Sequence, residues 1–557
     1  MTEFSESGDS QASPQVATRA ATPAPVRRWQ GRKLLNRISK HGACAGCGRR
    51  VLDPDTGVIH ARSSKGYAVT IGLVRCGRIW FCPECSAAIR RGRTEELKTA
   101  ALRHLAAGGT LAVIVLTARH NHTTELDRLS DALWGAQMVG ADGSPVRDRS
   151  GKARRVPGAY QTMLTDPAFY GRPEARNRWT RKDGSVGESI RPAEPGIRHS
   201  IGYIGMARAS EVTRSQANGW HPHMNLLAFL GATVDGTPAN GTLDPEGYFE
   251  PTEESLTEWE DWLRDLWART LRKADPKFEP STECGIPDCK CRGKGHGVMV
   301  QIVKSPDAAA LIEYLTKVQD GKPPTDSVRG DLDAAGGAAL ETANASSKTG
   351  RGRKTMTPFQ MLYRLWDLEV AELDPRQAEG YGTAAQCRAW WAEYETAMAG
   401  RRAIEWTRGL RRHLGLVGDD SEEQDLQYVY EQQKPDDLTG GVIMTPDAHA
   451  TVVQADAEMD VKAVIEAECY ESAADLVAGL GGRRNHVRIA TAEELAEIQE
   501  ALFARVIARR EELERQARIA EYEADQAEQE RAQLLARLNG DGDRPARTDR
   551  ETGTSKH

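Results

Sequence analysis

Apolar and polar residues follow one another along this 557-residue chain in patterns that predict both strands and helices. The unbroken apolar run at 111–117 predicts a buried strand, and another strand is expected at 298–303. Strands at 202–213 and 220–230 should form a hairpin, because the Asn-Gly pair at 218–219 favours the positive φ angles of a turn. Helical spacing of apolar residues predicts helices at 125–139, 252–274, 305–319, 386–413 and 493–538. This order favours an α+β fold, with an antiparallel sheet and helices on one face.

Charge is segregated along the chain, although the total is only −6. Residues 27–98 hold 16 basic and 5 acidic side chains, a net of +11, and residues 147–192 hold 11 and 5, a net of +6. Residues 419–437 carry a net charge of −7. The near-neutral total argues against a nucleic-acid partner, but a local basic field decides whether a polyanion can dock. The first 200 residues are therefore a candidate surface for nucleic acid, and solvated charged faces are the alternative.

No segment has the character of a membrane span or a secretion signal. The longest purely aliphatic run covers six residues, 111–116, whereas a bilayer needs ~20. The N-terminus has no apolar signal segment. We therefore expect a cytoplasmic protein without a membrane anchor.

The ten cysteines are clustered, which favours metal binding in a reducing cytosol over a disulfide scaffold. Two Cys-x2-Cys pairs predict a tetrahedral Zn²⁺ site, and redox dithiols or unpaired core cysteines are the alternatives. Its four predicted ligands are Cys44, Cys47, Cys82 and Cys85, and Cys76 can replace one of them. A second candidate zinc cluster consists of Cys284, Cys289, Cys291 and His296.

Two further motifs carry candidate chemistry. His221 and His223 are two residues apart on a predicted strand, so both imidazoles point to one face and can hold a divalent cation near a phosphate. Tyr314 and Lys317 lie on one face of the predicted helix 305–319. A tyrosine hydroxyl is a weak nucleophile until a cation assists it. The alternatives are half-exposed strand histidines and an ordinary surface tyrosine.

Several stretches, in this order, resemble the HUH-endonuclease replication initiators of rolling-circle plasmids, in particular those of actinobacteria. An apolar strand ends in Thr at 112–117, and the strand 209–213 precedes Gly-Trp-His-Pro-His at 219–223. Tyr-Leu-Thr-Lys at 314–317 resembles the nucleophile motif, and residues 391–406 resemble a segment that follows the catalytic core. The resemblance spans roughly residues 40–412, including a Cys-x2-Cys pair.

The resemblance implies that His221 and His223 bind a catalytic Mg²⁺ or Mn²⁺ and that Tyr314 is the nucleophile. Glu211 is the candidate third ligand, because one hairpin register places it opposite His223, whereas a slip of one residue turns it to the other face. His120 and His122, just past the first strand, are the alternatives.

The chain departs from some relatives at one position. Those relatives carry a Glu one helical turn before the tyrosine, where it activates the water that ends replication, and this chain has Ala310 there. Glu313 or Asp307 is the candidate substitute. Lys317, one turn beyond Tyr314, can stabilise the phenolate or the phosphate.

The resemblance implies a metal-dependent endonuclease and strand transferase that cuts one strand at a plasmid origin and stays bound to the 5′ end. Single- and double-stranded origin DNA is the expected partner, with a host helicase, a replicase and a second copy of the chain as further candidates. The alternatives are an HUH-type transposase and a non-enzymatic zinc-ribbon regulator that binds DNA.

Together these features predict a modular chain. A zinc ribbon precedes a catalytic palm, and a helical extension follows. The predicted regions are a disordered tail at 1–26, a zinc-ribbon DNA-binding module at 27–105, the HUH catalytic domain at 106–320 with a mobile basic insertion at 140–200, a linker at 321–356, a helical segment packing on the core at 357–415, an acidic linker and small mixed region at 416–490, a long helix at 491–538 and a disordered tail at 539–557.

Overall fold

The described residues of the protein form two compact units, each built from segments that are not contiguous in sequence. The first unit draws on residues 1–50 and 74–433, and the second on residues 51–73 and 434–557. The computed structural model describes residues 23–140, 144, 146–148, 154–181, 183–234, 245–281, 283–285, 295–303, 355–416, 422–431 and 437–505.

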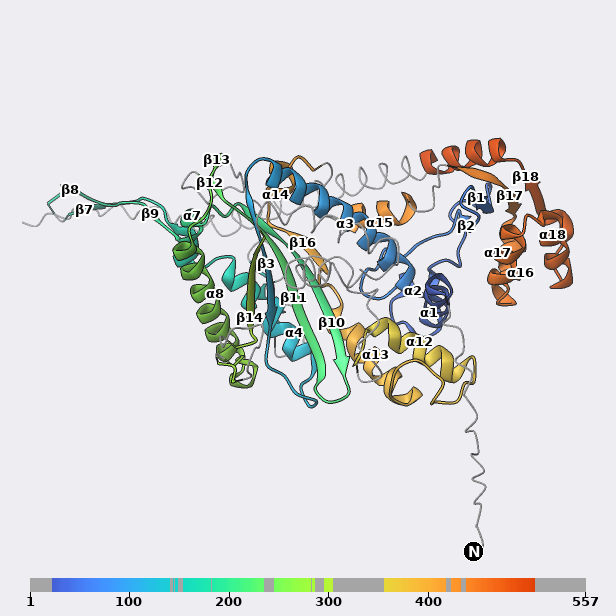
Figure 1. Cartoon of the computed structure of the whole chain (residues 1–557), viewed down its shortest axis with the longest axis horizontal. Coiled ribbons are helices and arrows are strands. Elements are labelled where there is room, and N and C mark those ends of the chain that lie inside the picture. The colour runs from blue at the N-terminus through green and yellow to red at the C-terminus, as the bar shows by residue number, and fades with distance from the viewer. Residues whose placement is uncertain are drawn as a thin grey trace, which may run out of the picture. The chain divides into compact units, whose positions relative to one another are not determined.

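An antiparallel six-stranded sheet lies at the centre of the first unit (Figure 1). The strand order is β14-β3-β11-β10-β15, and β16 also pairs with β10. All four strands that the apolar pattern predicted are confirmed here. The strands are β3 (Thr110–Thr117), β10 (Gly205–Ser215), β11 (Gly219–Leu230), β14 (Val298–Val303), β15 (Thr355–Met356) and β16 (Ile404–Trp406).

Odd-numbered residues of β3, β10 and β11 share one face of this sheet, because directly opposed residues of paired strands point to the same side. At one end this face is covered by α3 (Pro83–Ala106) and α14 (Leu410–His413). The apolar core there includes Leu97, Ala101, Leu105, Leu111, Val113, Leu227, Phe229, Trp406 and Leu410. The polar residues that carry the candidate chemistry lie at the other end of the same face.

Helices cover the opposite face as well, so the prediction of helices on one face is wrong. Trp134 of α4 (Leu126–Trp134) donates its indole N–H to Ser210 Oγ at 3.1 Å. Ser210 is even-numbered, so its side chain lies on the face opposite to the odd-numbered residues. Helix α8 (Glu253–Ala274) contacts α4 and β14. Both faces of the central strands are apolar and buried, so each face needs a cover.

A group of helices surrounds the N-terminal part of the first unit. Arg27 pairs with Asp367 at 2.6 Å, and Trp29 contacts Trp366 edge-to-face at 5.6 Å. The predicted helix 386–413 is only half correct, because glycines with positive φ follow α13 and interrupt it (Gly400, +69°, and Gly409, +83°). The helices are α1 (Ala24–Ile38), α2 (Gly42–Gly46), α12 (Pro358–Glu369), α13 (Ala384–Met398) and α15 (Glu422–Glu431).

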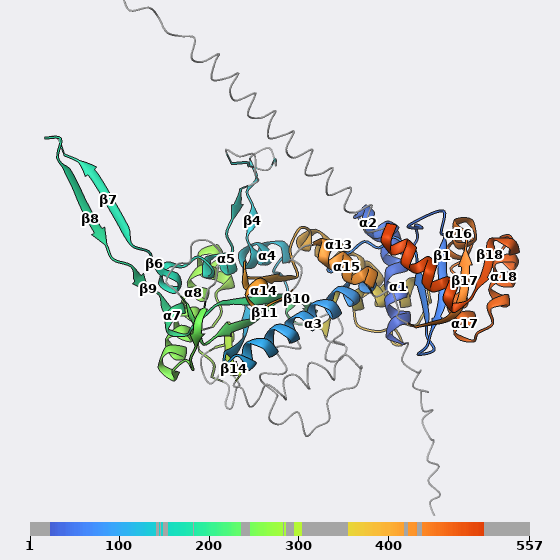
Figure 2. The same cartoon turned by 90° about the horizontal axis from the view of Figure 1, so that it is seen from above.

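The predicted insertion at 140–200 contains regular structure, which corrects the prediction of a basic loop. Its largest element is a two-stranded hairpin of β7 (Ala175–Thr180) and β8 (Val186–Arg191), which projects from the body of the first unit (Figures 1 and 2). The other short elements of the insertion are β5 (Arg155–Val156), α5 (Ala159–Met163), α6 (Pro167–Tyr170), β6 (Gly171–Arg172), β9 (Glu194–Pro195) and α7 (Ile197–Ser200). Outside the insertion, the first unit also contains β4 (Ala136–Gln137), which pairs with β5, the pair β12 (Ala232–Val234) and β13 (Pro245–Tyr248), and the 3₁₀ turn η1 (Pro276–Phe278).

The second unit combines a hairpin from the N-terminal region with the C-terminal region. Its four-stranded sheet has the order β18-β17-β1-β2, and helices pack on both of its faces. The elements are β1 (Val58–Ser63), β2 (Ala68–Ile71), β17 (Leu438–Met444), α16 (Pro446–Gln454), α17 (Glu458–Glu466), α18 (Tyr470–Gly479), the 3₁₀ turn η3 (Arg484–His486) and β18 (Val487–Ala490), followed by helical residues 492–505.

This arrangement divides the predicted zinc module at 27–105 between the two units. Within the predicted acidic linker and small mixed region at 416–490, residues 438–490 have a folded core. Residues 1–22 of the predicted tail at 1–26, the whole predicted tail at 539–557 and most of the linker at 321–356 lie outside the described residues. Residues 24–26 begin α1 and are not part of a disordered tail. None of the helices that the structure describes has the length and apolar character needed to span a bilayer.

Candidate functional site

The β10–β11 hairpin has the one of the two possible registers that brings the three predicted ligands together. Glu211 lies directly opposite His223, and Thr213 lies opposite His221. The Glu211 carboxylate is only 4% exposed, and its Oε2 lies 2.6 Å from His223 Nε2. The carboxylate and both imidazoles therefore face the same side, at the turn end of the hairpin.

A third histidine joins this group from the loop after β3. His120 Nε2 lies 3.3 Å from His221 Nδ1, and the two ring centroids are 4.8 Å apart. Gly219 allows the loop to approach, since its φ is +71° and a Cβ there would lie 2.9 Å from the Cα of His122. His122 itself is exposed. Of the two alternative ligands, the structure thus favours His120.

Burial keeps the imidazoles of His221 and His120 neutral. It lowers the pKa of His221 to about 3, with smaller contributions from His223 and His120, which would repel a positive charge. Burial also lowers the pKa of His120. A neutral imidazole is the form that binds a metal ion.

Three imidazoles and one carboxylate are a donor set that fits a divalent transition metal. Mg²⁺ prefers oxygen ligands, so this set favours Mn²⁺ over Mg²⁺. In the structure the donor atoms bond to one another, His120 to His221 and His223 to Glu211. These contacts leave two ways to hold an ion. Either His221 and His223 break these hydrogen bonds and bind the metal through the same nitrogens, or they bind it through their other ring nitrogens. In the second case Glu211 and His120 keep their hydrogen bonds and orient the rings.

A buried arginine, which the sequence analysis did not single out, lies behind Glu211. Arg90 of α3 is 5% exposed, donates its Nε to Ser86 at 3.3 Å and lines, with Glu211 and Tyr394, a small cavity of about 20 Å³. Burial lowers the pKa of Arg90, and attraction to Glu211 opposes this effect. The guanidinium therefore favours the ionised carboxylate that a metal ligand or a histidine partner needs. Only its burial distinguishes Arg90 from other basic residues near it.

Asn225 is a second residue that sequence analysis missed. It follows His223 on the same face, is fully buried, and its amide has no hydrogen-bond partner among the described residues. An unpaired buried amide costs free energy, so a polar partner is expected at this position. The sequence could have indicated Asn225, because it continues the spacing of two residues that places His221 and His223 on one face of the strand.

Tyr314, Lys317, Glu313, Ala310 and Asp307 lie outside the described residues. The described strands that flank this segment in sequence both belong to the central sheet. β14 ends at Val303, and β15 begins at Thr355, which pairs with Ser215 near the histidines.

The predicted zinc site forms a compact cysteine cluster, but with a different fourth member. The sulfur atoms of Cys47, Cys76, Cys82 and Cys85 all lie within 4.8 Å of one another. Cys47 is 3.7 Å from both Cys82 and Cys85, and Cys76 is 3.6 Å from Cys85. Ligands at ~2.3 Å from a tetrahedral zinc would be roughly 3.8 Å apart, so the spacing matches. Cys44 is buried but lies outside this compact group. In the group, Cys76 stands beside Cys47, Cys82 and Cys85, which is the replacement that the sequence allowed.

Local structure prepares these thiols for a metal. Hydrogen bonds from Cys76, and then from Cys82 and Cys85, lower the pKa of Cys47 well below its ordinary value. Asn36 of α1 donates its amide to the carbonyls of Cys44 and Cys47, at 2.6 and 3.2 Å. Cys82 is the N-cap residue of α3, and its hydrogen bond with Cys47, together with burial, raises its pKa well above the ordinary value, so without a metal the thiolate character is concentrated on Cys47.

Only part of the second cysteine cluster lies among the described residues. His296 Nε2 and Cys284 Sγ are 3.2 Å apart, whereas Cys289 and Cys291 lie outside the described residues. The pair adjoins the end of β3, where Thr117 donates its hydroxyl to the carbonyl of His296. Two of the four predicted ligands are therefore adjacent.

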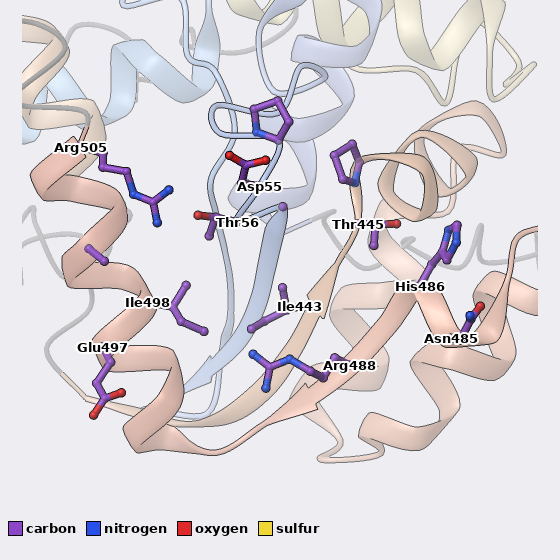
Figure 3. Close-up of a pocket in the computed structure, with 14 residues that line it drawn as sticks. Asp55, Thr56, Ile443, Thr445, Asn485, His486, Arg488, Glu497, Ile498 and Arg505 are labelled. Atoms are coloured by element: carbon purple, nitrogen blue, oxygen red, sulfur yellow. The ribbon is translucent and has the colours of Figure 1, made fainter.

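The second unit has an open hollow of about 660 Å³, with charged side chains of both signs on its walls (Figure 3). Arg488 pairs with Glu494, and Arg505 pairs with Asp53. Because these charges are compensated locally, the hollow gives no indication of a particular ligand. It belongs to a different unit from the histidine cluster.

The buried histidines predict a pH-dependent stability. Unfolded His221 takes up a proton near pH 6.5, and folded His221 only near 3, so the unfolded state binds more protons between these values. In a chelator, stability should therefore fall as pH drops from 6.5 towards 3, by up to about 2 kcal/mol between 6.5 and 5.

The His221→Gln variant should lose less stability over this range in urea titrations followed by tryptophan fluorescence. The exposed His122→Gln variant should behave like the wild type. Equal pH dependence of the wild type and His221→Gln would contradict the burial effect.

Two curated proteins resemble the chain over much of its length. "Protein rep" of Streptomyces lividans is 37% identical over 465 residues, covering 81% of this chain and 90% of that protein. A protein of Streptomyces cyanogenus named "Neomycin resistance protein" is 32% identical over 349 residues, covering 63% of this chain and 70% of that protein. No family model and no solved structure matches the chain. Since the first similarity spans most of both sequences, the chain belongs to the Rep protein family represented by the Streptomyces lividans protein.

Proposed function

We propose that this Rep protein initiates rolling-circle replication of a plasmid as an HUH-type endonuclease. It would cut one strand of the origin through Tyr314 and remain attached to the new 5′ end. The observation that carries the proposal is the hairpin register, which sets His221, His223 and Glu211 on one face of the central sheet. The similarity to a Rep-named protein supports the same process.

The chemistry is an in-line displacement at phosphorus. The hydroxyl oxygen of Tyr314 would lose its proton and attack the phosphodiester, the P–O3′ bond would break, and the 3′ oxygen would take up a proton. The products are a 5′-phosphotyrosine and a free 3′-hydroxyl, so the bond energy is kept for rejoining. A divalent cation held by His221 and His223 would polarise the phosphate and neutralise charge that develops there.

The residues around the histidines have distinct supporting roles in this proposal. Glu211 binds the cation or orients His223, and Arg90 keeps its carboxylate ionised. His120 orients the ring of His221. Lys317 would stabilise the phenolate, and Glu313 or Asp307 would activate the water that ends replication.

The same proposal assigns a structural zinc ion to the cysteine cluster. Its four compact thiols come from three places in the chain, namely α2 and its end, the loop before α3, and the start of α3. A zinc ion would fix the N-terminus of α3, the helix that carries Arg90 towards the histidine site.

The covalent step predicts a protein–DNA adduct. Fluorescent single-stranded 60-mers that tile the replicon encoding the protein are incubated with it and Mn²⁺, and adducts are scored on denaturing gels. One tile should give an adduct that Tyr314→Phe abolishes and that His221→Ala and His223→Ala reduce by at least ~100-fold. The exposed His122→Ala variant is the matched control and should retain the adduct.

No adduct with the wild type on any tile, or an undiminished adduct with Tyr314→Phe, would refute the nuclease. A non-enzymatic regulator would bind the origin without an adduct. A transposase would instead attack the ends of a mobile element, so adduct formation at the replication origin separates these two enzymes.

The cluster geometry predicts which cysteines hold zinc. Mass spectrometry of the purified protein should show that Cys82→Ser and Cys76→Ser each remove about one equivalent of zinc. Cys44→Ser and the exposed control Cys469→Ser should retain it. Loss of zinc in Cys44→Ser with retention in Cys76→Ser would instead support the ligand set expected from the two Cys-x2-Cys pairs.

A further inference from the structure

The β7–β8 hairpin projects from the first unit as a two-stranded ribbon (Figure 2). Nearly every residue of both strands is exposed, Gly187 being the buried exception. Six cross-strand pairs hold the ribbon together, from Ala175–Arg191 to Thr180–Val186. We call this hairpin the arm.

An isolated two-stranded ribbon is only marginally stable in water, because neither face buries apolar surface. The arm nevertheless exposes three large apolar side chains, Trp179 (45%), Val186 (66%) and Ile190 (54%). Such a surface is expected where a partner covers it.

Arginine is the most frequent polar residue of the arm. Residues 171–195 carry six basic and four acidic side chains, a net charge of +2, and most of them belong to the longer segment 147–192 of net charge +6. Arg176 and Arg178 are 61% and 70% exposed and pair with Glu174 and Glu188. Ion pairs between side chains this exposed contribute little, so phosphate groups can replace the carboxylates. Arg181 and Arg191 are exposed and make no ion pair with the described residues.

The two faces of the arm differ in a way that suits nucleic acid. Trp179 lies over Gly187, where a Cβ would come within 2.6 Å of the indole ring. Asn177, Ser189 and Arg191 share this face, and these side chains can bond to phosphates and base edges. The opposite face carries Arg176 and Arg178 beside Val186 and Ile190.

We propose that the arm binds duplex DNA and lies in its major groove, beside the strand that the histidine site would cut. A two-stranded ribbon is one of the two elements that this groove admits. Six residues per strand extend about 20 Å, enough to follow the groove over several base pairs. The inference rests on the proposed function for the location of the DNA, but binding by the arm can be measured without cleavage.

The test compares two triple variants with equal loss of charge. Arg176→Ala, Arg178→Ala and Arg181→Ala are combined in the arm variant. The control combines Arg269→Ala, Arg376→Ala and Arg388→Ala, three exposed and ion-paired arginines outside the arm. Binding of the full-length proteins to a fluorescein-labelled 30-base-pair duplex of arbitrary sequence is measured by fluorescence anisotropy. The salt concentration is varied over about 50–200 mM, a range in which affinity that depends on phosphate contacts falls strongly.

The arm variant should bind the duplex on the order of tenfold more weakly, and the slope of log K against log salt should decrease by about 2–3. The control should stay within about twofold of the wild type. Replacing Glu174 and Glu188 by Gln should strengthen binding, which a folding defect would not do. Adduct formation on the single-stranded tile should not change, because the arm contacts only the duplex.

Unchanged duplex affinity and salt slope in the arm variant would overturn the proposal. So would a loss of self-association in sedimentation without any change in DNA binding, since the arm would then join two copies of the chain. If the arm variant loses duplex binding while the wild type forms no adduct, the arm proposal holds and the nuclease fails. If instead the wild type forms the adduct and the arm variant keeps its affinity for the duplex, the arm proposal is rejected and the nuclease proposal stands.

Discussion

The pairing of Glu211 with His223 across the β10–β11 hairpin is the constraint on which the candidate site depends. Side chains alternate along a strand, so a slip of one residue would turn the carboxylate away from both imidazoles. The register is fixed from both directions, since β11 also pairs with β3, where Thr117 opposes His223. At the turn, the positive φ of Gly219 allows the loop carrying His120 to reach His221. The hairpin thereby brings together side chains from its own two strands and from the loop after β3.

Helix α3 connects this site to the cysteine cluster. Cys82 and Cys85 stand at its N-terminus, Arg90 lies behind Glu211 about a turn and a half later, and Leu97 to Leu105 pack on the far end of the same sheet face. The second half of the helix packs against the sheet, and Arg32 of α1 pairs with Glu84 in its first turn. A metal ion at the cysteines would hold the first half further, and with it the guanidinium of Arg90 behind Glu211.

Local patterns were sufficient to predict four strands of the central sheet and the placement of two histidines on one of them. The apolar run that became β3, the Asn-Gly turn and the spacing of His221 and His223 act over a few residues, and the structure confirms the strands and the hairpin. Features that depend on distant contacts were missed. The burial of Arg90 and the pairing of β1 with β17 across more than 370 residues are examples. The arm escaped detection because both of its faces are exposed, which removes the apolar alternation.

Anomalous diffraction from crystals of the Tyr314→Phe protein soaked in Mn²⁺ would locate the cation without relying on any reaction. We expect one strong manganese peak within about 2.3 Å of a ring nitrogen of both His221 and His223, with Glu211 as a third ligand or bonded to a ligating ring. The peak should disappear in crystals of His223→Ala. A fully occupied manganese ion elsewhere in the palm, with both histidines still bonded only to His120 and Glu211, would contradict a metal site on this hairpin.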